Sequence, residues 1–355
     1  MKKILKTLLI IIIILAAAAG GGLIYLTVTE YKPEDTESIE NYGTATRQLT
    51  PGDTLSVLTY NIGYGANDAQ HDFFMDGGKT VTTESVDNIN SNMEGISSVI
   101  YAANADVSFL QEVDIDSKRS YGVDEASLLA NAFPESKYAF ANNFLCNYIP
   151  YPFPSTIGRV DSGIMTISPF DTESTERVSL SNSFDWPIST CQLKRCLLVE
   201  RVPLTDSTKK LVLVNLHLEA YDNGEGKITQ YRELCDFIKL EYAKGNYVIA
   251  GGDFNATLPS VNSDLYPLKL TDNFEPASIS TDMLQTGWKY CTDDTTPSSR
   301  LLNEPYDPES ENTQYYVIDG FICSPNVLVE DVLTIDTGFE YSDHNPVVAK
   351  FTLVK

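Results

Sequence analysis

Basic residues and histidines are scarce in this chain of 355 residues. It has 25 Lys and Arg against 49 Asp and Glu, a formal net charge of −24 at pH 7, and three histidines. A surface this acidic repels nucleic-acid phosphates, so non-specific binding to a nucleic-acid backbone is not expected to be its main role. The composition is 43% hydrophobic and 10% aromatic, which excludes a wholly disordered chain, a collagen-like repeat and a coiled coil.

Common cofactor and metal motifs are missing as well. Neither the phosphate-binding loop GxxxxGK[ST] nor the dinucleotide-binding pattern GxGxxG occurs, and no internal repeat is visible. The six cysteines form no CxxC motif and no pair with histidine at zinc spacing, which excludes the common structural zinc sites. No cysteine precedes Cys146, so a lipid-modified cysteine after a signal sequence is excluded. Disulfides are permitted outside the cytoplasm, and the sequence leaves open whether Cys191–Cys196 or Cys146–Cys291 forms one.

Charged residues are absent from Thr7 to Thr29, and this run is the strongest targeting signal in the chain. As a helix, its 23 residues span roughly 34 Å, which is enough to cross the hydrocarbon core of a bilayer. Three lysines, at positions 2, 3 and 6, precede the run, and Glu30 follows it. The positive-inside rule then places the N-terminus in the cytoplasm and the bulk of the chain outside.

We interpret residues 1–30 as an N-terminal transmembrane signal anchor. The alternative is a secretory signal peptide that is cut near residues 16–22, where small side chains favour cleavage, and that releases a secreted protein. The apolar run resumes at residues 23–26, beyond the small side chains, and this favours the anchor. We therefore expect a single-pass protein of the cell membrane, with residues 7–29 in the bilayer and the rest extracytoplasmic.

The remainder divides into a linker and one domain. Residues 31–53 are polar, hold two prolines and two glycines and show no periodicity, so we expect an extracytoplasmic linker. Residues 54–355 alternate between predicted strands and helices, with amphipathic helices at 85–104 and 229–243. Several apolar runs follow one another with no helix between them, which favours mixed sheets with helices on their outer faces. The runs are 55–60, 107–111, 163–168, 196–202, 211–218, 247–252, 315–322 and 347–354.

Polar side chains stand at the ends of several predicted strands, where a half-buried strand does not require them. A buried carboxylate is costly unless it is paired or bound to a metal, so this recurrence indicates a site assembled at one rim of the sheets. Two of the three histidines belong to the group, and imidazole can carry protons or donate hydrogen bonds to phosphate at neutral pH. The group is Asn61, Glu112, His217, Asp253, Asn255, Asp319 and His344.

Hydrolysis of a phosphate ester is the chemistry that this group suits. Glu112, with Asn61 and Asp343 nearby, offers only oxygen ligands, which favour Mg²⁺ over zinc and leave Mn²⁺ or Ca²⁺ as alternatives. Such an ion neutralises charge on the phosphoryl group and on the leaving oxygen.

Hydrogen-bond donors and a base complete the predicted chemistry. Asn255 and the two histidines can donate to the non-bridging phosphate oxygens. Asp253 can orient and activate the attacking water. Asp319 is expected to hold the imidazole of His344 in one tautomer and to favour its protonated form.

Six short motifs occur in order between residues 55 and 354, namely TYNI, LQEV, NLHL, GDFN, IDGF and SDHNP. This ordered set resembles the metal-dependent endonuclease/exonuclease/phosphatase superfamily, which includes deoxyribonucleases and neutral sphingomyelinases. The resemblance implies an α/β (α+β) fold, a four-layer α/β/β/α sandwich of two mixed β-sheets flanked by helices. It also implies that residues 54–355 are a catalytic domain, a Mg²⁺-dependent hydrolase acting on phosphoric diesters.

The resemblance further implies roles for individual residues. It leaves open whether an imidazole or Asp253 accepts the proton of the water. Asn215, beside His217, is expected to support substrate binding. Arg159, in the strand GRVDSGIMTIS, is a candidate phosphate contact, and the alternative is a solvated loop residue. The implied catalytic residues are His217, Asp253, Asn255, Asp319 and His344, and the implied metal residues are Asn61, Glu112 and Asp343.

The substrate is not determined by the family. A lipid or other small phosphodiester is favoured, because a membrane anchor keeps the enzyme at such a substrate and the acidic charge disfavours nucleic acid. The aromatic residues of loop 147–158 are candidates for touching lipid, and a proline-stiffened cover over the sheet edge is the alternative. An extracellular nuclease and an inactive surface binding module are the competing functions. We expect a monomer.

Overall fold

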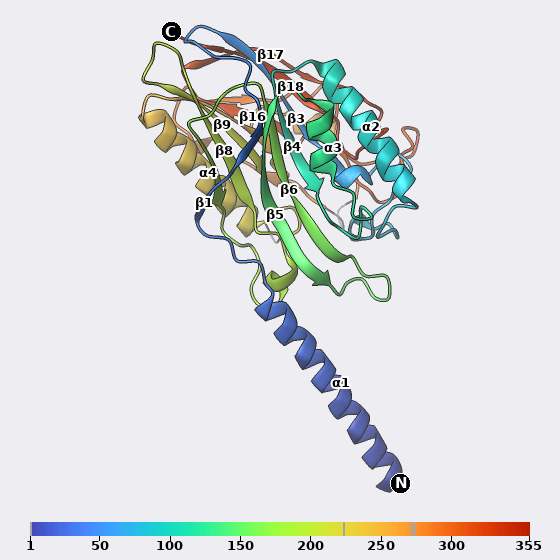
Figure 1. The fold of residues 1–355 in the computed structure, drawn as a ribbon. Coiled ribbons are helices and arrows are strands. Elements are labelled where there is room, and N and C mark those ends of the chain that lie inside the picture. Colours follow the sequence, from blue (N-terminus) through green and yellow to red (C-terminus); the bar gives the residue numbers. More distant parts are fainter. Residues whose placement is uncertain (1, 223, 271–273) are drawn as a thin grey trace.

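Two seven-stranded mixed β-sheets face each other, and helices cover their outer faces, in the computed structural model of the protein (Figure 1). The structure describes residues 2–222, 224–270 and 274–355. The arrangement confirms the predicted four-layer α/β/β/α sandwich, and both sheets mix parallel and antiparallel pairs.

The first sheet, which we call the β3 sheet, carries α2 (Val86–Ala103) and α3 (Glu125–Ala132) on its outer face. Strands β3 and β4 run parallel, and the other neighbouring pairs run antiparallel. In spatial order the strands are β17 (Val327–Thr334), β18 (Val347–Leu353), β3 (Thr54–Asn61), β4 (Val107–Asp114), β6 (Gly158–Ser168), β5 (Lys137–Ile149) and β2 (Asn41–Gly43).

The second sheet, which we call the β10 sheet, carries α4 (Glu225–Ala243) on its outer face. Strands β9 and β10 run parallel, and the other neighbouring pairs run antiparallel. In spatial order the strands are β1 (Thr36–Ser38), β7 (Ser174–Ser179), β8 (Cys196–Pro203), β9 (Lys210–His217), β10 (Tyr247–Asp253), β16 (Asp319–Cys323) and β13 (Lys289–Cys291).

Short elements complete the described part of the chain. Two small ribbons pair β11 (Ala256–Thr257) with β12 (Ala277–Ser278) and β14 (Ser299–Arg300) with β15 (Tyr315–Tyr316). The 3₁₀ helices are η1 (Gly63–Gly65), η2 (Phe74–Asp76), η3 (Ile188–Cys191), η4 (Ser263–Leu265) and η5 (Thr281–Met283).

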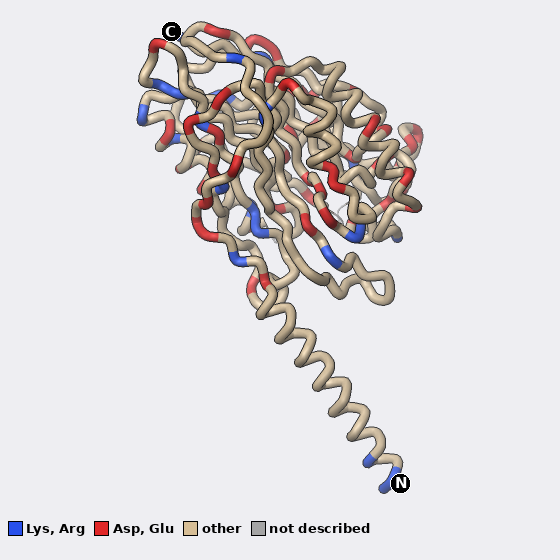
Figure 2. The backbone as a smooth tube through the Cα atoms, in the orientation of Figure 1, with Lys and Arg blue, Asp and Glu red and all other residues tan. Residues whose placement is uncertain are grey.

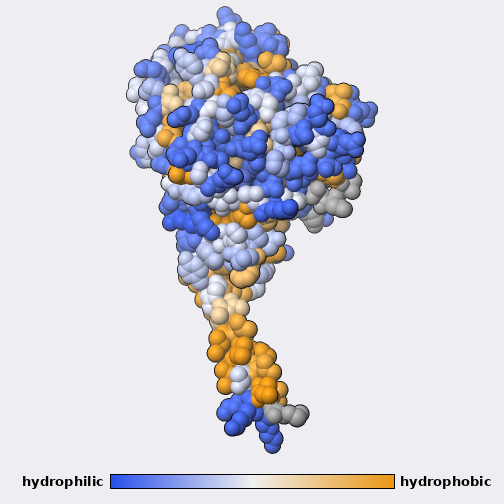
Figure 3. Space-filling view, turned by 90° about the vertical axis from the view of Figure 1, so that its right-hand side faces the viewer, coloured by the Kyte–Doolittle hydropathy of each residue, from blue (hydrophilic) through white to orange (hydrophobic). Residues whose placement is uncertain are grey.

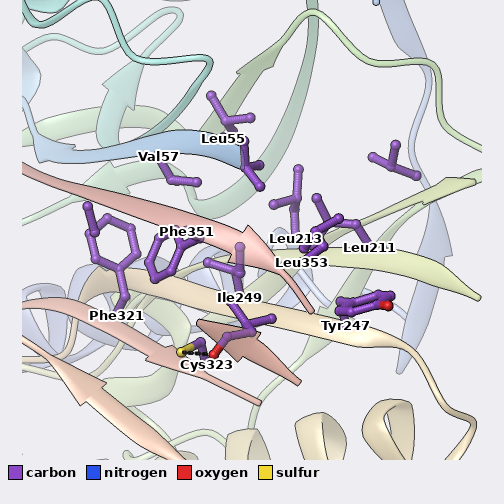
Figure 4. Packing of buried hydrophobic residues seen from close by; sticks show 14 of the residues in the cluster. Leu55, Val57, Leu211, Leu213, Tyr247, Ile249, Phe321, Cys323, Phe351 and Leu353 are labelled. Carbon is purple, nitrogen blue, oxygen red and sulfur yellow. Dashed lines mark hydrogen bonds between the residues drawn. The ribbon is translucent and has the colours of Figure 1, made fainter. Parts of the chain in front are cut away.

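Apolar side chains from the facing sides of the two sheets form the central core (Figure 4). The ring centroids of Phe109 and Phe321, which come from different sheets, lie 6.5 Å apart. Along β3, Val57 enters this core, whereas Leu58 and Tyr60 pack on the side of α2, because successive strand residues point to opposite faces. Both faces of these strands are buried, which is why the sequence shows continuous apolar runs rather than strict alternation.

Residues 31–53 differ from the free linker that their composition predicts. β1 pairs with β7 and β2 pairs with β5, so the segment extends one edge of each sheet. Leu49 is 1% exposed and belongs to the central core beside Leu204. Edge strands of three residues are held by backbone hydrogen bonds and need no hydrophobic periodicity, so composition does not reveal them.

Helix α1 (Lys2–Val28) projects from one end of the sandwich, and none of its residues is buried (Figure 1). It is long and apolar enough to cross a membrane. Figure 2 shows basic residues at its free end and none along the rest, and Figure 3 shows it as an apolar rod on a largely hydrophilic body. These features fit a single-pass anchor and equally a signal sequence.

All six cysteines are free thiols. Neither Cys191–Cys196 nor Cys146–Cys291, the two bridges that the sequence left open, is formed. Instead, a hydrogen bond to Cys191 raises the pKa of Cys146, so these two thiols are adjacent. A hydrogen bond to Cys323 has the same effect on Cys291.

Glu200 generates a prediction for stability. On β8 it lies on the same face as Leu198 and Val202, which face the other sheet, and its Oε2 has no hydrogen-bond partner among the described residues. Burial raises the pKa of Glu200 to about 8. The unfolded chain releases the Glu200 proton near the ordinary pKa of 4.5, whereas the folded chain keeps it until about pH 8. The stability that Glu200 contributes is therefore fully present below pH 4.5 and is lost as the pH rises through about 8.

We predict that Glu200→Gln lessens the loss of stability between pH 5 and pH 8.5. Each pH unit in this window is worth about 1.4 kcal/mol for one such group, so the variant melts higher than the wild type at the upper pH. Thermal unfolding of the full chain in detergent, followed by circular dichroism, measures this. Glu330→Gln, an exposed residue of β17, is the matched control. Parallel pH profiles for the wild type and Glu200→Gln would contradict the prediction.

Candidate active site

The carboxyl ends of β3, β4, β9 and β10 meet at one end of the sandwich. β3 runs parallel to β4, and β9 to β10, so each pair presents its last residues at the same edge. Asn61 and Asp253, the last residues of β3 and β10, are joined across the sheets by a hydrogen bond of 3.0 Å from Asn61 Nδ2 to Asp253 Oδ2. The facing sheets thus bring polar strand ends from both halves of the chain into one cluster.

Glu112 is positioned by an irregularity in β4. The pairing of β4 with β6 shifts between Leu110 and Val113, and Glu112 adopts a left-handed backbone conformation with φ of 55°. This conformation costs a non-glycine residue about 1–3 kcal/mol and recurs at functional sites. The carboxylate lies beside the amide of Asn61, whose Nδ2 is 3.1 Å from Glu112 Oε1, and it stays partly exposed to a cavity.

His344 lies just before β18 and is buried beside Asp319, the first residue of β16. Its Nδ1 is 2.8 Å from Asp319 Oδ2, which also accepts a hydrogen bond of 2.8 Å from Ser298 Oγ. Burial lowers the pKa of His344, but the charge and hydrogen bond of Asp319, with the charges of Asp253 and Asp343, raise it well above its usual value. The imidazole of His344 therefore carries a proton at neutral pH.

His217 ends β9 and faces the same carboxylate. Its Nε2 lies 3.5 Å from Asp253 Oδ2. Burial, helped by the positive charges of Arg195 and His344, lowers the pKa of His217 well below its usual value, so this imidazole is neutral. Burial and the charge of Asp319 raise the pKa of Asp253 to about 6. His344 is therefore protonated and His217 is neutral, on either side of the carboxylate of Asp253. This difference lets one imidazole act as an acid while the other does not.

The two other predicted asparagines, Asn255 and Asn215, have different positions. Asn255 has a left-handed backbone with φ of 48°, its N–H donates to Asp253 Oδ1 at 2.8 Å, and it lines the cavity. Asn215 is fully buried, and its Nδ2 donates to the carbonyls of Leu110 at 3.2 Å and Met165 at 2.9 Å. Because both acceptors belong to the other sheet, Asn215 ties the sheets together beneath the site and does not reach the cavity.

Oxygen atoms suited to a divalent cation gather around Glu112. Asp343 is half-buried, and its desolvation together with the charge of Glu112 raises the pKa of Asp343. Asn67 Oδ1, on a residue that lines the same cavity, is buried without a hydrogen-bond partner among the described residues. Two nearby carboxylates and unsatisfied amide oxygen fit a hard cation held on the side of Asn61, Glu112 and Asp343.

A second group also has the geometry of a cation site. Asp253, Asp319 and His344 place ligand atoms within 4.8 Å of one another. A protonated imidazole has no lone pair to offer, so His344 can ligate only after losing its proton. The hydrogen bond to Asp319 stabilises the protonated form of His344. The group of Asp253, Asp319 and His344 is therefore better suited to hold a proton on His344 than to bind a metal cation.

A cavity of about 650 Å³ opens over these residues. Its volume is that of a small-molecule site. Its floor contains Glu112, His217, Asp253, Asp343 and His344. Its walls are largely apolar and come from distant parts of the chain, including Leu23, Leu26, Phe73, Phe144, Ile149, Tyr151, Ile157, Ile188 and Leu193.

Three largely buried arginines line the cavity, Arg119, Arg195 and Arg300, and sequence analysis did not find them. Arg119 stacks over the ring of Tyr64 at 3.7 Å and pairs with Asp114 at 2.8 Å. Arg195 and Arg300 each have a buried Nε without a partner among the described residues. Guanidinium groups in a cavity are suited to bind phosphate. They come from unrelated segments without a shared motif, so no local signal marks them.

Arg159, the predicted phosphate contact, is not brought to this cluster. Its side chain on β6 is 49% exposed, and its guanidinium pairs with Asp116 at 3.1 Å and Asp161 at 3.5 Å. It lies outside the set of described residues that line the cavity. Its position matches the alternative, a solvated arginine.

Comparisons with known proteins agree with this architecture. A family model described as the Endonuclease/Exonuclease/phosphatase family matches residues 58–344. No curated protein matches the chain.

Solved structures share the fold at low sequence identity. An endonuclease/exonuclease/phosphatase from Beutenbergia cavernae DSM 12333 is 17% identical, with 85% of this chain and 72% of that chain covered and a TM-score of 0.59. TDP2 from Caenorhabditis elegans is 17% identical, with 85% and 75% covered and a TM-score of 0.52. A family protein from Bacteroides thetaiotaomicron is 15% identical, with 85% and 96% covered and a TM-score of 0.53.

The family match runs from β3 to His344 and therefore contains every predicted site residue from Asn61 onward. The structural likeness supports the fold alone at these identities. The chain belongs to the Endonuclease/Exonuclease/phosphatase family, whose members hydrolyse phosphate esters.

Proposed function

We propose that this protein is a metal-dependent phosphodiesterase, with Mg²⁺ as its preferred ion, that acts on a lipid or other small phosphodiester outside the cytoplasmic membrane. The cavity carries the proposal, because its floor holds two imidazoles and several carboxylates while its walls are largely apolar. Such a floor suits a phosphate ester, and such walls suit an apolar group attached to it.

Asn61, Glu112 and Asp343 are the residues that would hold the cation. When bound there, a divalent cation supplies positive charge to the phosphoryl oxygens and to the leaving oxygen. The Nδ2 of Asn61 donates to both Glu112 and Asp253, at 3.1 Å and 3.0 Å. Asn61 thereby fixes the position of Glu112, on the metal-binding side, relative to Asp253, on the side that acts on water.

Asp253 and the residues around it carry out the proton transfers of the proposed reaction. Its Oδ1 is fixed by the N–H of Asn255, and its Oδ2 lies 3.5 Å from His217 Nε2 and 3.8 Å from His344 Nε2. In the proposed mechanism Asp253 orients the attacking water and accepts its proton. The protonated His344 donates to an oxygen that gains negative charge, and His217 binds a non-bridging oxygen.

The substrate is inferred from charge and shape. A nucleic acid requires a basic surface along its backbone, whereas this chain has a net charge of −24. Its cavity arginines, Arg119, Arg195 and Arg300, lie inside an apolar-walled pocket, where they suit the single phosphate of a small diester. A nuclease is the second candidate, since the same arginines can bind the phosphate at the end of a nucleic-acid strand.

The location follows from α1. We infer that α1 is a single-pass anchor with the lysines at positions 2, 3 and 6 on the cytoplasmic side and the catalytic domain outside. This location keeps the domain beside membrane lipids.

We predict that the full chain in detergent hydrolyses bis-p-nitrophenyl phosphate with Mg²⁺, loses this activity in EDTA and regains it when Mg²⁺ returns. Headgroup release from phosphatidylcholine or sphingomyelin vesicles, without cutting of single- or double-stranded DNA, supports the lipid substrate. Cutting of DNA without lipid turnover supports the nuclease. Absence of hydrolysis of every substrate with Mg²⁺, Mn²⁺ and Ca²⁺ in the folded protein would count against a phosphodiesterase.

His344→Gln and Asp253→Asn should each lower kcat on bis-p-nitrophenyl phosphate by on the order of 10² or more, because each removes a group that moves a proton or offsets charge. Steady-state kinetics measure this, with thermal unfolding as a check on folding. His71→Gln is the matched control, a buried histidine outside the cluster. Wild-type turnover in either site variant removes that residue from the mechanism.

Glu112→Gln should raise the Mg²⁺ concentration for half-maximal activity by on the order of tenfold or more, because a neutral amide is a weaker ligand than a carboxylate. A Mg²⁺ titration of the initial rate measures this. Asp116→Asn, an exposed carboxylate four residues along the chain, is the matched control. An unchanged Mg²⁺ titration for Glu112→Gln is the result that would rule out its role as a ligand.

A further inference from the structure

Helix α1 leaves the domain at the same end as the active site. β5 runs in the same direction as β3 and β4, because β4 and β5 are both antiparallel to β6. The last residue of β5, Ile149, therefore lies at the end of the sandwich that carries Asn61 and Glu112. Figure 1 shows α1 projecting from this end, where β5 ends and β6 begins.

The last turns of α1 form part of the cavity wall. Leu23 and Leu26 line the cavity and are half-buried, whereas Ile24, between them in sequence, is 68% exposed. A spacing of three places Leu23 and Leu26 on one face of the helix, and this face is turned towards the domain. The membrane-type helix is thus a component of the site as well as a tail attached to it.

Polar contacts hold this face of α1 against the domain. Trp186 Nε1 donates to Thr27 Oγ1 at 3.1 Å, and Lys194 Nζ pairs with Glu30 Oε1 at 2.8 Å. Residues 29–35 then lead to β1, which is paired with β7, and within them the carbonyls of Glu34 and Asp35 accept hydrogen bonds from Ser179. These contacts leave no free linker between α1 and the sandwich.

The depth of the cavity mouth follows from helix geometry. The charge-free run ends at Thr29, so Thr29 marks the outer limit of the apolar span. At 1.5 Å per residue, Leu26 and Leu23 lie about 5 Å and about 9 Å inward of Thr29 along the helix axis. When α1 spans a bilayer, the cavity wall therefore reaches into the boundary between headgroups and acyl chains.

Exposed apolar side chains surround this mouth. Phe153, in the connection between β5 and β6, is 89% exposed, and Tyr151 beside it is 61% exposed. Trp186 and Ile188, at the start of η3 next to α1, are 59% and 58% exposed. We call these four residues the rim. Aromatic and aliphatic side chains so exposed are unfavourable in water and favourable at a membrane interface.

The alternative for the β5–β6 connection is a cover over the sheet edge. A covering residue has its apolar surface removed from water, whereas Phe153 keeps 89% of its surface exposed. The face of the domain that Figure 3 draws is largely hydrophilic, whereas Trp186 and Ile188 are also more than half exposed. Trp186 contacts α1, and the rim lies at the end of the sandwich from which α1 projects, which indicates that the outer leaflet covers it.

We propose that the rim and the last turns of α1 form a docking surface for the outer leaflet, and that the wall containing Leu23 and Leu26 holds an acyl chain of a membrane phospholipid. The lipid enters the cavity sideways along α1, and its phosphate then reaches the floor of the site. This inference rests on the proposed function for the identity of the substrate. The docking surface itself rests on the exposure of the rim and the position of α1.

Tryptophan fluorescence tests the docking surface without any need for activity. The chain has two tryptophans, and Trp288 is buried, so Trp288→Phe leaves Trp186 as the reporter. The full chain is reconstituted into phosphatidylcholine vesicles in which one acyl chain is brominated near its carbonyl end. We expect the bromine to quench Trp186 emission by about half or more, since indole at this depth contacts the brominated segment.

A second reporter provides the matched control. Tyr101, at the end of α2 and 77% exposed, precedes β4 and lies at the opposite end of the sandwich from Glu112. In a chain carrying Trp186→Phe, Trp288→Phe and Tyr101→Trp, the bromine should leave the emission unchanged. Equal, weak quenching of both reporters in protein that has inserted into the vesicles would overturn the docking surface, and so would failure of the full chain to insert.

Activity tests the acyl-chain wall. In Phe153→Ser with Trp186→Ser, the ratio of vesicle-lipid turnover to bis-p-nitrophenyl phosphate turnover should fall by on the order of tenfold. Tyr101→Ser and Leu240→Ser, at the far end of the domain, should keep the wild-type ratio. Leu26→Trp narrows the wall and should lower the ratio, whereas Ile24→Trp on the lipid-facing side should not.

The outcomes separate the two proposals. A wild-type ratio in Phe153→Ser with Trp186→Ser and in Leu26→Trp overturns the acyl-chain wall while phosphodiester hydrolysis stands. Hydrolysis of the soluble diester without turnover of any vesicle lipid overturns the lipid site. Absence of all hydrolysis, with Trp186 still quenched, rejects the proposed function and keeps the docking surface.

Discussion

The hydrogen bonds of a single amide hold the active site together. Asn61 Nδ2 donates to Glu112, which lies in the adjacent strand β4, and to Asp253, which belongs to the opposite sheet. Buried carboxylates that approach one another are costly unless donors or positive charge offset them. The amide can reach both only because the core between the sheets, with Phe109 against Phe321, sets the separation of β3 and β10. The chemistry of the site therefore depends on the packing of the sandwich.

The same burial gives the two imidazoles opposite properties. His344 has Asp319 at 2.8 Å, and this partner outweighs the cost of burying its charge. His217 has no hydrogen-bond partner for its buried Nδ1 among the described residues and lies near Arg195, so its neutral form is favoured. Two histidines in one cavity thus have different roles. His344 is a proton donor and His217 is neutral, and both imidazoles lie near Asp253.

Acidity and apolarity are separated in space in this protein. On the face drawn in Figure 3 the domain surface is largely hydrophilic, whereas α1 is an apolar rod, and acidic residues outnumber basic ones in the chain (Figures 2 and 3). In the proposed function, charge repulsion would disfavour anionic polymers, whereas the cavity offers three guanidinium groups, of Arg119, Arg195 and Arg300, to a small phosphate. In the proposed function, this arrangement would combine attachment to a membrane with selection of a compact substrate.

Local chemistry made much of this protein predictable from its sequence. The apolar run of α1, the doubly buried strands and the polar residues at Asn61, Glu112, Asp253 and His344 are all visible in short windows. The tertiary structure alone decided that Arg119, Arg195 and Arg300 line the cavity while Arg159 does not, because that depends on which distant loops meet. It also decided that residues 36–43 extend both sheets and that Leu23 and Leu26 face the site. Backbone pairing at an edge and contact between remote segments leave no periodic pattern in the sequence.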